Sequence, residues 1–63
     1  MNLPQDFKDL VIAAIEDELG AVAMYEQMAN MVSNPTLKAI LHSIAGDEYS
    51  HARTFMTILA LDD

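Results

Sequence analysis

The feature that most constrains this chain is a pair of stripes in which apolar side chains recur at alternating steps of four and three residues. That spacing places side chains on one face of an α-helix, the face that a helix buries. The stripes, interrupted near their middles by carboxylates and one imidazole, are Phe7-Val11-Ala14-Glu18-Ala21-Tyr25-Met28-Val32 and Leu37-Leu41-Ile44-Glu48-His51-Phe55-Ile58. They predict two amphipathic helices that carry ionisable groups on their buried faces.

The segment between the stripes predicts a sharp reversal of the chain. We expect one helix over about residues 4–32, a turn at 33–35 and a second helix over about 36–61. Pro4 suits a first helical position, because the N–H that it lacks would have no helical partner there. Two helices, each about 40 Å long at 1.5 Å per residue, must fold back antiparallel across so short a link. The predicted fold class is all-α, with one domain over residues 1–63 that forms a two-helix hairpin.

Folding at the turn brings Glu18 level with Glu48, because each lies fifteen positions from Ser33. The same folding sets Gly20 against Gly46. A glycine inside a helix costs about 1 kcal/mol relative to alanine. A site that needs space, or a close approach of the two helices, would explain both glycines, and tolerated sequence drift is the alternative.

Glu18, Glu48 and His51 are predicted to bind a metal ion. A buried carboxylate without a partner is costly, so these groups need a shared one. Glu48 and His51 form a Glu-x-x-His motif, and helical bundles hold iron or manganese with one Glu from each of two helices and one such motif from each of two others. One chain supplies half of that set, so we expect a homodimer that forms a four-helix bundle around two metal ions. Oxygen and nitrogen ligands without sulfur favour iron or manganese, with zinc as an alternative.

The other polar residues have weaker predictions. Tyr25 lies seven residues after Glu18, close enough to hydrogen-bond a metal ligand, although a core aromatic is the simpler interpretation. Asp17 and Asp47 fall off the stripes and are predicted to be solvated, with an access route for cations as the alternative. His42 is predicted to lie on the surface or at the rim of the dimer.

Charge and length limit the partners. Ten acidic residues against three basic ones give a formal net charge of −7, which argues against nucleic-acid and anionic-membrane partners and favours cations. The chain begins without a leader-like segment, and it has no apolar run of the roughly 18 residues that span a bilayer. A fold this small hides only about 60% of the surface that its unfolded chain exposes, so self-association is expected. We therefore expect a cytoplasmic protein that forms homo-oligomers.

With these motifs in place, the chain resembles the ferritin-like superfamily, in particular the encapsulated ferritins and, among them, the archaeal domains fused to or packaged by an encapsulin shell. The resemblance implies that Glu18, Glu48 and His51 bind iron in a di-iron ferroxidase centre between two chains. It also implies that dimers assemble into a ring, a decamer, which oxidises Fe(II) with oxygen and delivers Fe(III) for storage inside an encapsulin nanocompartment. Manganese or zinc would be substitutes. The residues that carry the resemblance are 18–29, 37–41, Asp47-Glu48 and His51.

The chain departs from the bacterial members of that group. They carry further glutamates where this chain has Asp17 and Gly20, so the resemblance does not extend to their outer metal site. They also have a third helix and a targeting tail, and fusion to a shell subunit beyond Asp63 would account for both differences. Asp62 places negative charge at the predicted helix end, where the helix dipole disfavours it, so we expect fraying or a continuing chain.

Two other functions fit the pattern. A rubrerythrin-like peroxide reductase shares the Glu, Tyr and Glu-x-x-His arrangement, but it usually draws electrons from a cysteine-ligated iron module, and this chain has no cysteine. A structural dimerisation hairpin would use its buried polar residues only to fix the register of its helices.

Overall fold

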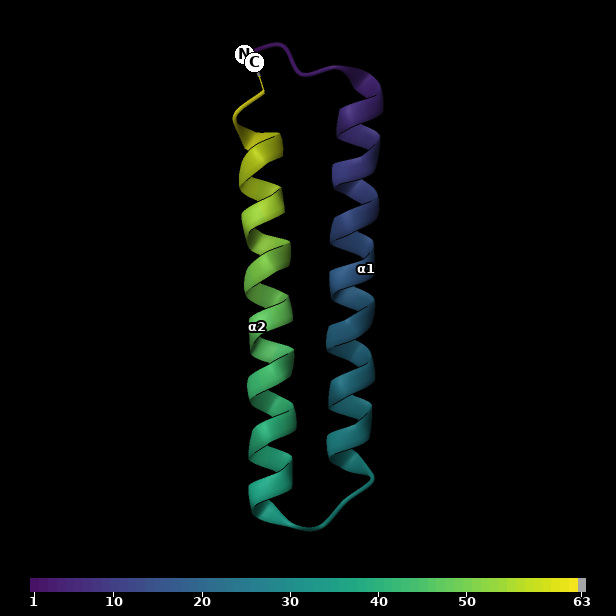
Figure 1. Ribbon diagram of the computed structural model, residues 1–63, viewed down its shortest axis with the longest axis vertical. Coiled ribbons are helices and arrows are strands. Elements are labelled where there is room, and N and C mark those ends of the chain that lie inside the picture. The colour runs from purple at the N-terminus through teal and green to yellow at the C-terminus, as the bar shows by residue number, and fades with distance from the viewer. Residues whose placement is uncertain (63) are drawn as a thin grey trace.

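Two antiparallel α-helices of 26 residues each make up most of the computed structural model, which describes residues 1–62 (Figure 1). Helix α1 spans Gln5–Asn30 and helix α2 spans Pro35–Ala60. The Cα trace extends over 48 × 15 × 9 Å, the shape of a single hairpin. The all-α hairpin predicted from the stripes is confirmed. Within the described residues, neither helix combines the length and apolar character needed to cross a membrane.

The turn is held from both sides by local hydrogen bonds. At the start of α2, Asn34 Oδ1 accepts a hydrogen bond from the backbone N–H of Leu37 at 2.9 Å. An asparagine cap of this kind contributes about 1 kcal/mol, and Pro35 follows it where no helical N–H is needed. Lys38 Nζ donates to the backbone oxygen of Ala29 at 2.6 Å, so a carbonyl near the end of α1 gains a partner. These contacts make the reversal of the chain well defined.

The helices pack along a narrow seam that differs from the predicted buried face. Its fully buried members include three alanines, and small side chains let helices approach closely. Val11 and Leu41 of the predicted stripes are buried within the hairpin, whereas Met28 and His51 are exposed in a single copy. A two-helix hairpin buries only the side chains that point at the other helix, and these two lie one position to the side. The buried residues are Val11, Ile15, Ala29, Leu41, Ala45 and Ala52.

Apolar side chains flank the seam on both sides, because heptad positions next to a seam point to opposite sides of it. We call one flank the site band: Phe7, Ala14, Ala21, Met28, Leu37, Ile44, His51 and Ile58. We call the other the far band: Ile12, Leu19, Glu26, His42, Tyr49 and Met56. Met28 and Leu37 line one groove of the site band, and the Glu26 and His42 side chains meet at 3.0 Å in the far band. The hairpin thus presents two apolar surfaces. Met31, which follows the end of α1, lines the same groove as Met28 and Leu37.

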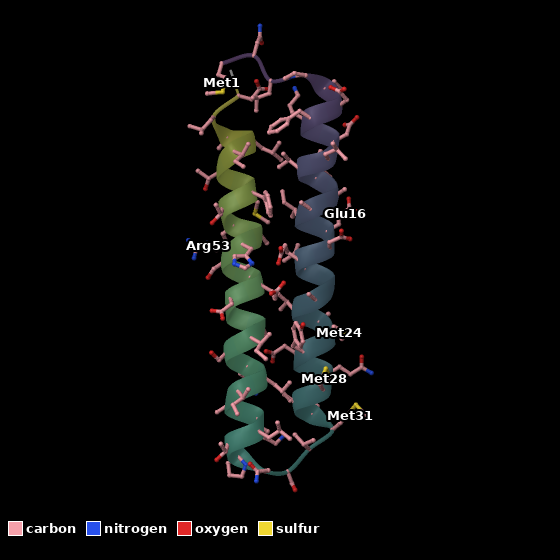
Figure 2. All side chains as sticks on the ribbon, in the orientation of Figure 1. Met1, Glu16, Met24, Met28, Met31 and Arg53 are labelled. Atoms are coloured by element: carbon pink, nitrogen blue, oxygen red, sulfur yellow. The ribbon has the colours of Figure 1, made fainter. Side chains whose placement is uncertain are left out.

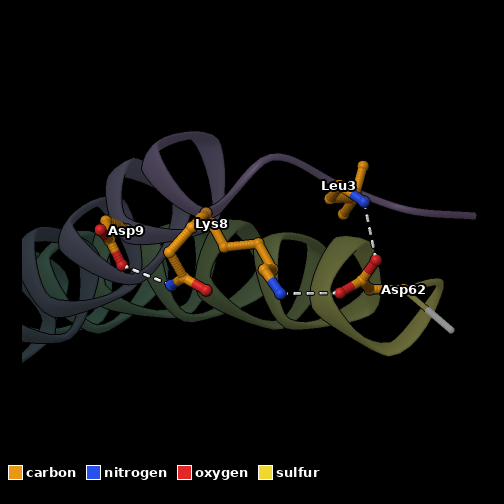
Figure 3. Close-up of polar contacts among 5 residues, drawn as sticks. Leu3, Lys8, Asp9 and Asp62 are labelled. Carbon is orange, nitrogen blue, oxygen red and sulfur yellow. Dashed lines mark hydrogen bonds and ion pairs between the residues drawn. The ribbon is translucent and has the colours of Figure 1, made fainter.

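A clasp closes the open end of the hairpin (Figure 3). The Asp62 carboxylate accepts a hydrogen bond from the backbone N–H of Leu3 at 2.8 Å and another from Lys8 Nζ at 3.0 Å. The hydrogen bond from Leu3, followed by that from Lys8, lowers the pKa of Asp62 below its ordinary value. Helix α2 ends at Ala60, so Asp62 lies beyond the helix end, where these two donors hold its carboxylate.

Candidate metal centre

The structure brings Glu18, Glu48 and His51 together at the middle of the hairpin. Each offers a ligand atom, and these atoms all lie within 4.8 Å of one another. Glu48 and His51 point the same way because residues three apart on a helix are neighbours. Glu18 reaches them from α1 across the seam. The register inferred from the turn therefore places these three side chains in one cluster.

Glu18 is partly buried, and one of its two carboxylate oxygens has no hydrogen-bond donor. Its Oε2 atom is shielded from solvent and makes no hydrogen bond within the described part of the chain. That atom lies 3.5 Å from His51 Nδ1, a distance too long for a good hydrogen bond. Buried polar atoms in proteins almost always have a partner, and an exception requires an explanation. A bound cation would supply that partner.

The pKa of Glu48 is shifted by its neighbours in the cluster. A hydrogen bond with the Glu18 side chain is the main cause that raises the pKa of Glu48 above its ordinary value. Desolvation and the negative charge of Glu18 raise this pKa further, while His51 lowers it. Two carboxylates this close together repel one another when both are ionised, and a cation bound between them would relieve that repulsion.

The donor set fits a transition metal. Two carboxylates and one imidazole, without sulfur, suit iron, manganese or zinc. A cavity of about 210 Å³, lined by Glu18, His51, Thr54 and Phe55, opens beside the cluster. The His51 side chain is 59% exposed on the site band. The cluster is therefore closed toward the seam and open toward the site band, where additional ligands would have to come from.

The remaining predicted residues lie near the cluster or away from it. Tyr25 is half-buried on the seam, and its hydroxyl makes no hydrogen bond within residues 1–62, so its role beside a metal stays a prediction. Asp17 and Asp47 are exposed, and His42 lies on the surface as expected. Neither Gly20 nor Gly46 has an atom within 4 Å of an added Cβ, so close helix approach within the hairpin does not explain them.

Thr54 was missed by reasoning from the sequence. It lines the cavity together with Glu18 and His51. Its position three residues after His51 was the available signal, because that spacing places it on the next turn of the same side of α2.

A comparison with family models gives one match, to the model described as Rubrerythrin, over residues 9–61. The matched segment includes Glu18, Tyr25, Glu48 and His51. No curated protein and no solved structure matches the chain significantly.

Proposed function

The chain belongs to the rubrerythrin family, within the ferritin-like superfamily, and from that premise we propose that two copies form a di-iron ferroxidase. Its substrate would be Fe(II), oxidised to Fe(III) with oxygen as the electron acceptor. The observation that carries the proposal is the cluster of Glu18, Glu48 and His51, in which a buried carboxylate oxygen has no donor. A cation is the partner that such a cluster requires.

A second copy of the chain would complete the site. One copy offers three ligands and leaves the cluster open on the site band, whose apolar members Phe7, Met28 and Leu37 are 41–43% exposed. A twofold axis perpendicular to the helices, at the level of Glu18, would place two site bands face to face. The resulting four helices would bring together four glutamates and two histidines, the ligand inventory of di-iron bundles.

The residues of the chain would then have distinct tasks. Bound iron supplies the redox chemistry, which no side chain of this protein can perform alone. Glu48 would bind the cation through its carboxylate, and the Glu18 oxygen without a donor would be a second ligand. His51 would bind through an imidazole nitrogen, and Tyr25 would orient a ligand from the seam. The cavity at Thr54 and Phe55 gives small molecules access to the cluster.

Peroxide reduction is the second candidate, because the family match itself favours it. None of the 63 residues is a cysteine, so a reductase would have to draw its electrons from a donor outside this sequence. Faster turnover with peroxide than with oxygen, given an electron donor, would favour the reductase. A purely structural hairpin is disfavoured by Glu18, because a buried oxygen without a donor destabilises the fold.

We extend the proposal to assembly and storage. The far band, with Ile12, Leu19, Tyr49 and Met56 exposed by 38–50%, would join dimers into a ring, in line with a decamer. The cavities along the described hairpin measure only about 210–280 Å³, so iron mineral would have to be stored elsewhere. An encapsulin shell in the cytoplasm would provide that compartment.

The ferroxidase is tested by anaerobic loading with Fe(II), followed by admission of air. Wild-type protein should oxidise iron faster than buffer, and Glu48→Ala should lose at least about tenfold of that rate, as is typical when a metal ligand or its support is removed. Glu16→Ala is the matched control, because it removes an exposed carboxylate of α1 that lies outside the cluster. Equal rates for wild type and Glu48→Ala would rule out the assignment.

A further inference from the structure

The outer side of α2 carries a groove that the proposed ferroxidase does not use. It measures about 280 Å³ and is lined by Ser50, Arg53, Thr54 and Thr57. Arg53 projects from the side of α2 that faces away from α1 (Figure 2). The groove therefore lies away from the seam between the two helices. It shares Thr54 with the cavity beside the metal cluster.

Arg53 differs from the two lysines because its side chain has no partner in the described part of the chain. The chain has three basic residues. Lys8 pairs with Asp62, and Lys38 donates to a carbonyl at the turn. Within residues 1–62, Arg53 forms neither an ion pair nor a side-chain hydrogen bond, although the sequence contains ten acidic residues. No carboxylate lines the groove, so the guanidinium is available to an external anion.

The threonine hydroxyls of the groove have fixed orientations. Thr54 Oγ1 donates to the backbone oxygen of Ser50 at 2.9 Å, and Thr57 Oγ1 donates to that of Arg53 at 3.1 Å. Because each hydroxyl proton is already used, the threonine oxygens can only accept hydrogen bonds from a ligand. The Ser50 hydroxyl and the Arg53 guanidinium supply the donors. The groove thus combines acceptors with a positively charged donor.

We propose that this groove binds inorganic phosphate in a partly protonated form. The guanidinium fork matches two oxygens of a tetrahedral anion, and the P–OH group of hydrogen phosphate can donate to a threonine oxygen. Sulfate has the same shape and charge sign but no proton at neutral pH, so it cannot use the threonine acceptors. The groove is therefore expected to distinguish the two anions.

A phosphate held there would lie beside the cavity of the metal cluster, since both are lined by Thr54. It would provide a counter-anion for ferric iron as the iron leaves the site. This consequence rests on the proposed function, whereas phosphate binding itself does not. The binding test therefore uses metal-free protein.

The test is an NMR titration of the metal-free chain with phosphate and, separately, with sulfate at matched ionic strength. Phosphate should give saturable shifts confined to the amides of residues 50–57 and to the Arg53 Nε–H, with sulfate clearly weaker. Arg53→Gln should lower the phosphate affinity by about tenfold or more, and Arg53→Lys should fall between, because it keeps the charge but loses the fork. Thr54→Val, which keeps the side-chain shape, should reduce the preference for phosphate over sulfate, while Ser43→Ala should change neither.

Three results would overturn the proposal. Equal shifts with both anions would mean that Arg53 pairs with any anion through its charge alone. An unchanged phosphate affinity in Arg53→Gln would remove the residue on which binding depends. A loss of oligomer in Arg53→Gln without a phosphate effect would mean that Arg53 pairs with a second copy instead. Glu48→Ala should still bind phosphate, so failure of this site and failure of the ferroxidase are separable.

Discussion

Carboxylates at the middle and at the open end of the hairpin differ in their hydrogen-bond donors and in the direction of their pKa shifts. At the open end, Asp62 accepts hydrogen bonds from Leu3 and Lys8, and its pKa is lowered. At the middle, Glu18 has an oxygen without a donor, and the pKa of Glu48 is raised. The carboxylate of the clasp has its donors within one chain, whereas one oxygen of the cluster has none in the described residues.

This difference separates structure from function. An acid whose pKa is lowered on folding stabilises the fold when ionised, and an acid whose pKa is raised opposes it. Selection for stability alone would disfavour Glu18, since a shielded carboxylate oxygen without a hydrogen-bond donor is costly. The acids at the middle of the seam are therefore best explained by a ligand.

The largest expected effect comes from adding a metal ion. Anaerobic Fe(II) or Mn(II) at about 100 times its Kd should stabilise the wild type by about 2.7 kcal/mol, which corresponds to a rise in Tm of about 10–20 °C for a domain of this size. Glu48→Gln should abolish the rise, because the amide cannot replace the ionised ligand. Calorimetry with and without a chelator measures both, with Glu16→Gln as the control. An equal rise in Tm for Glu48→Gln and Glu16→Gln would show that the cluster does not bind the metal.

The next effect distinguishes the two bands beside the seam. Met28 in the site band and Met56 in the far band are exposed by 41% and 43%, which makes them a matched pair. Met28→Glu should weaken the metal-competent dimer by about tenfold or more, because it buries a charge in the proposed interface. Met56→Glu should leave metal binding intact and affect only larger assemblies. Sedimentation at several concentrations, with metal binding measured in parallel, tests this assignment. Loss of the metal-binding dimer in Met56→Glu but not in Met28→Glu would contradict it.

Several parts of this comparison were predictable from sequence. The turn and the stripes placed Glu18 opposite Glu48, because helical register depends only on local spacing. The rotation of the seam toward Ile15 and Ala52 was not predictable, since the apolar surface of each helix is wider than one partner helix can cover. The clasp was missed because it joins Leu3 to Asp62, residues 59 positions apart, and no local pattern signals such a contact.

A smaller effect concerns pH at the middle of the hairpin. Because the pKa of Glu48 is raised, its proton stabilises the folded metal-free chain at low pH, and this contribution is lost as the pH rises through the raised pKa. Metal affinity should show the reverse dependence, falling as the pH is lowered through that pKa, because proton and cation compete. Carboxyl carbon NMR of Glu48 should give a midpoint above the ordinary value for glutamate, and Glu18→Ala should lower it. A midpoint at or below the ordinary value in the wild type would contradict the raised pKa of Glu48.

The smallest effect is expected at the clasp. Asp62→Asn keeps the shape of the side chain but removes the charge that Lys8 and the Leu3 N–H stabilise, so Tm should fall by only a few degrees, as for other partly exposed ion pairs. The sign of the pH dependence is opposite to that of Glu48. The pKa of Asp62 is lowered, so its contribution is present above the ordinary aspartate pKa and is lost as the pH falls through the lowered value. Wild type and Asp62→Asn should therefore differ at neutral pH and converge in strong acid, while metal binding stays the same in both. Loss of metal binding in Asp62→Asn would show that the clasp and the cluster are coupled, and the division of the hairpin into a structural end and a functional middle would fail.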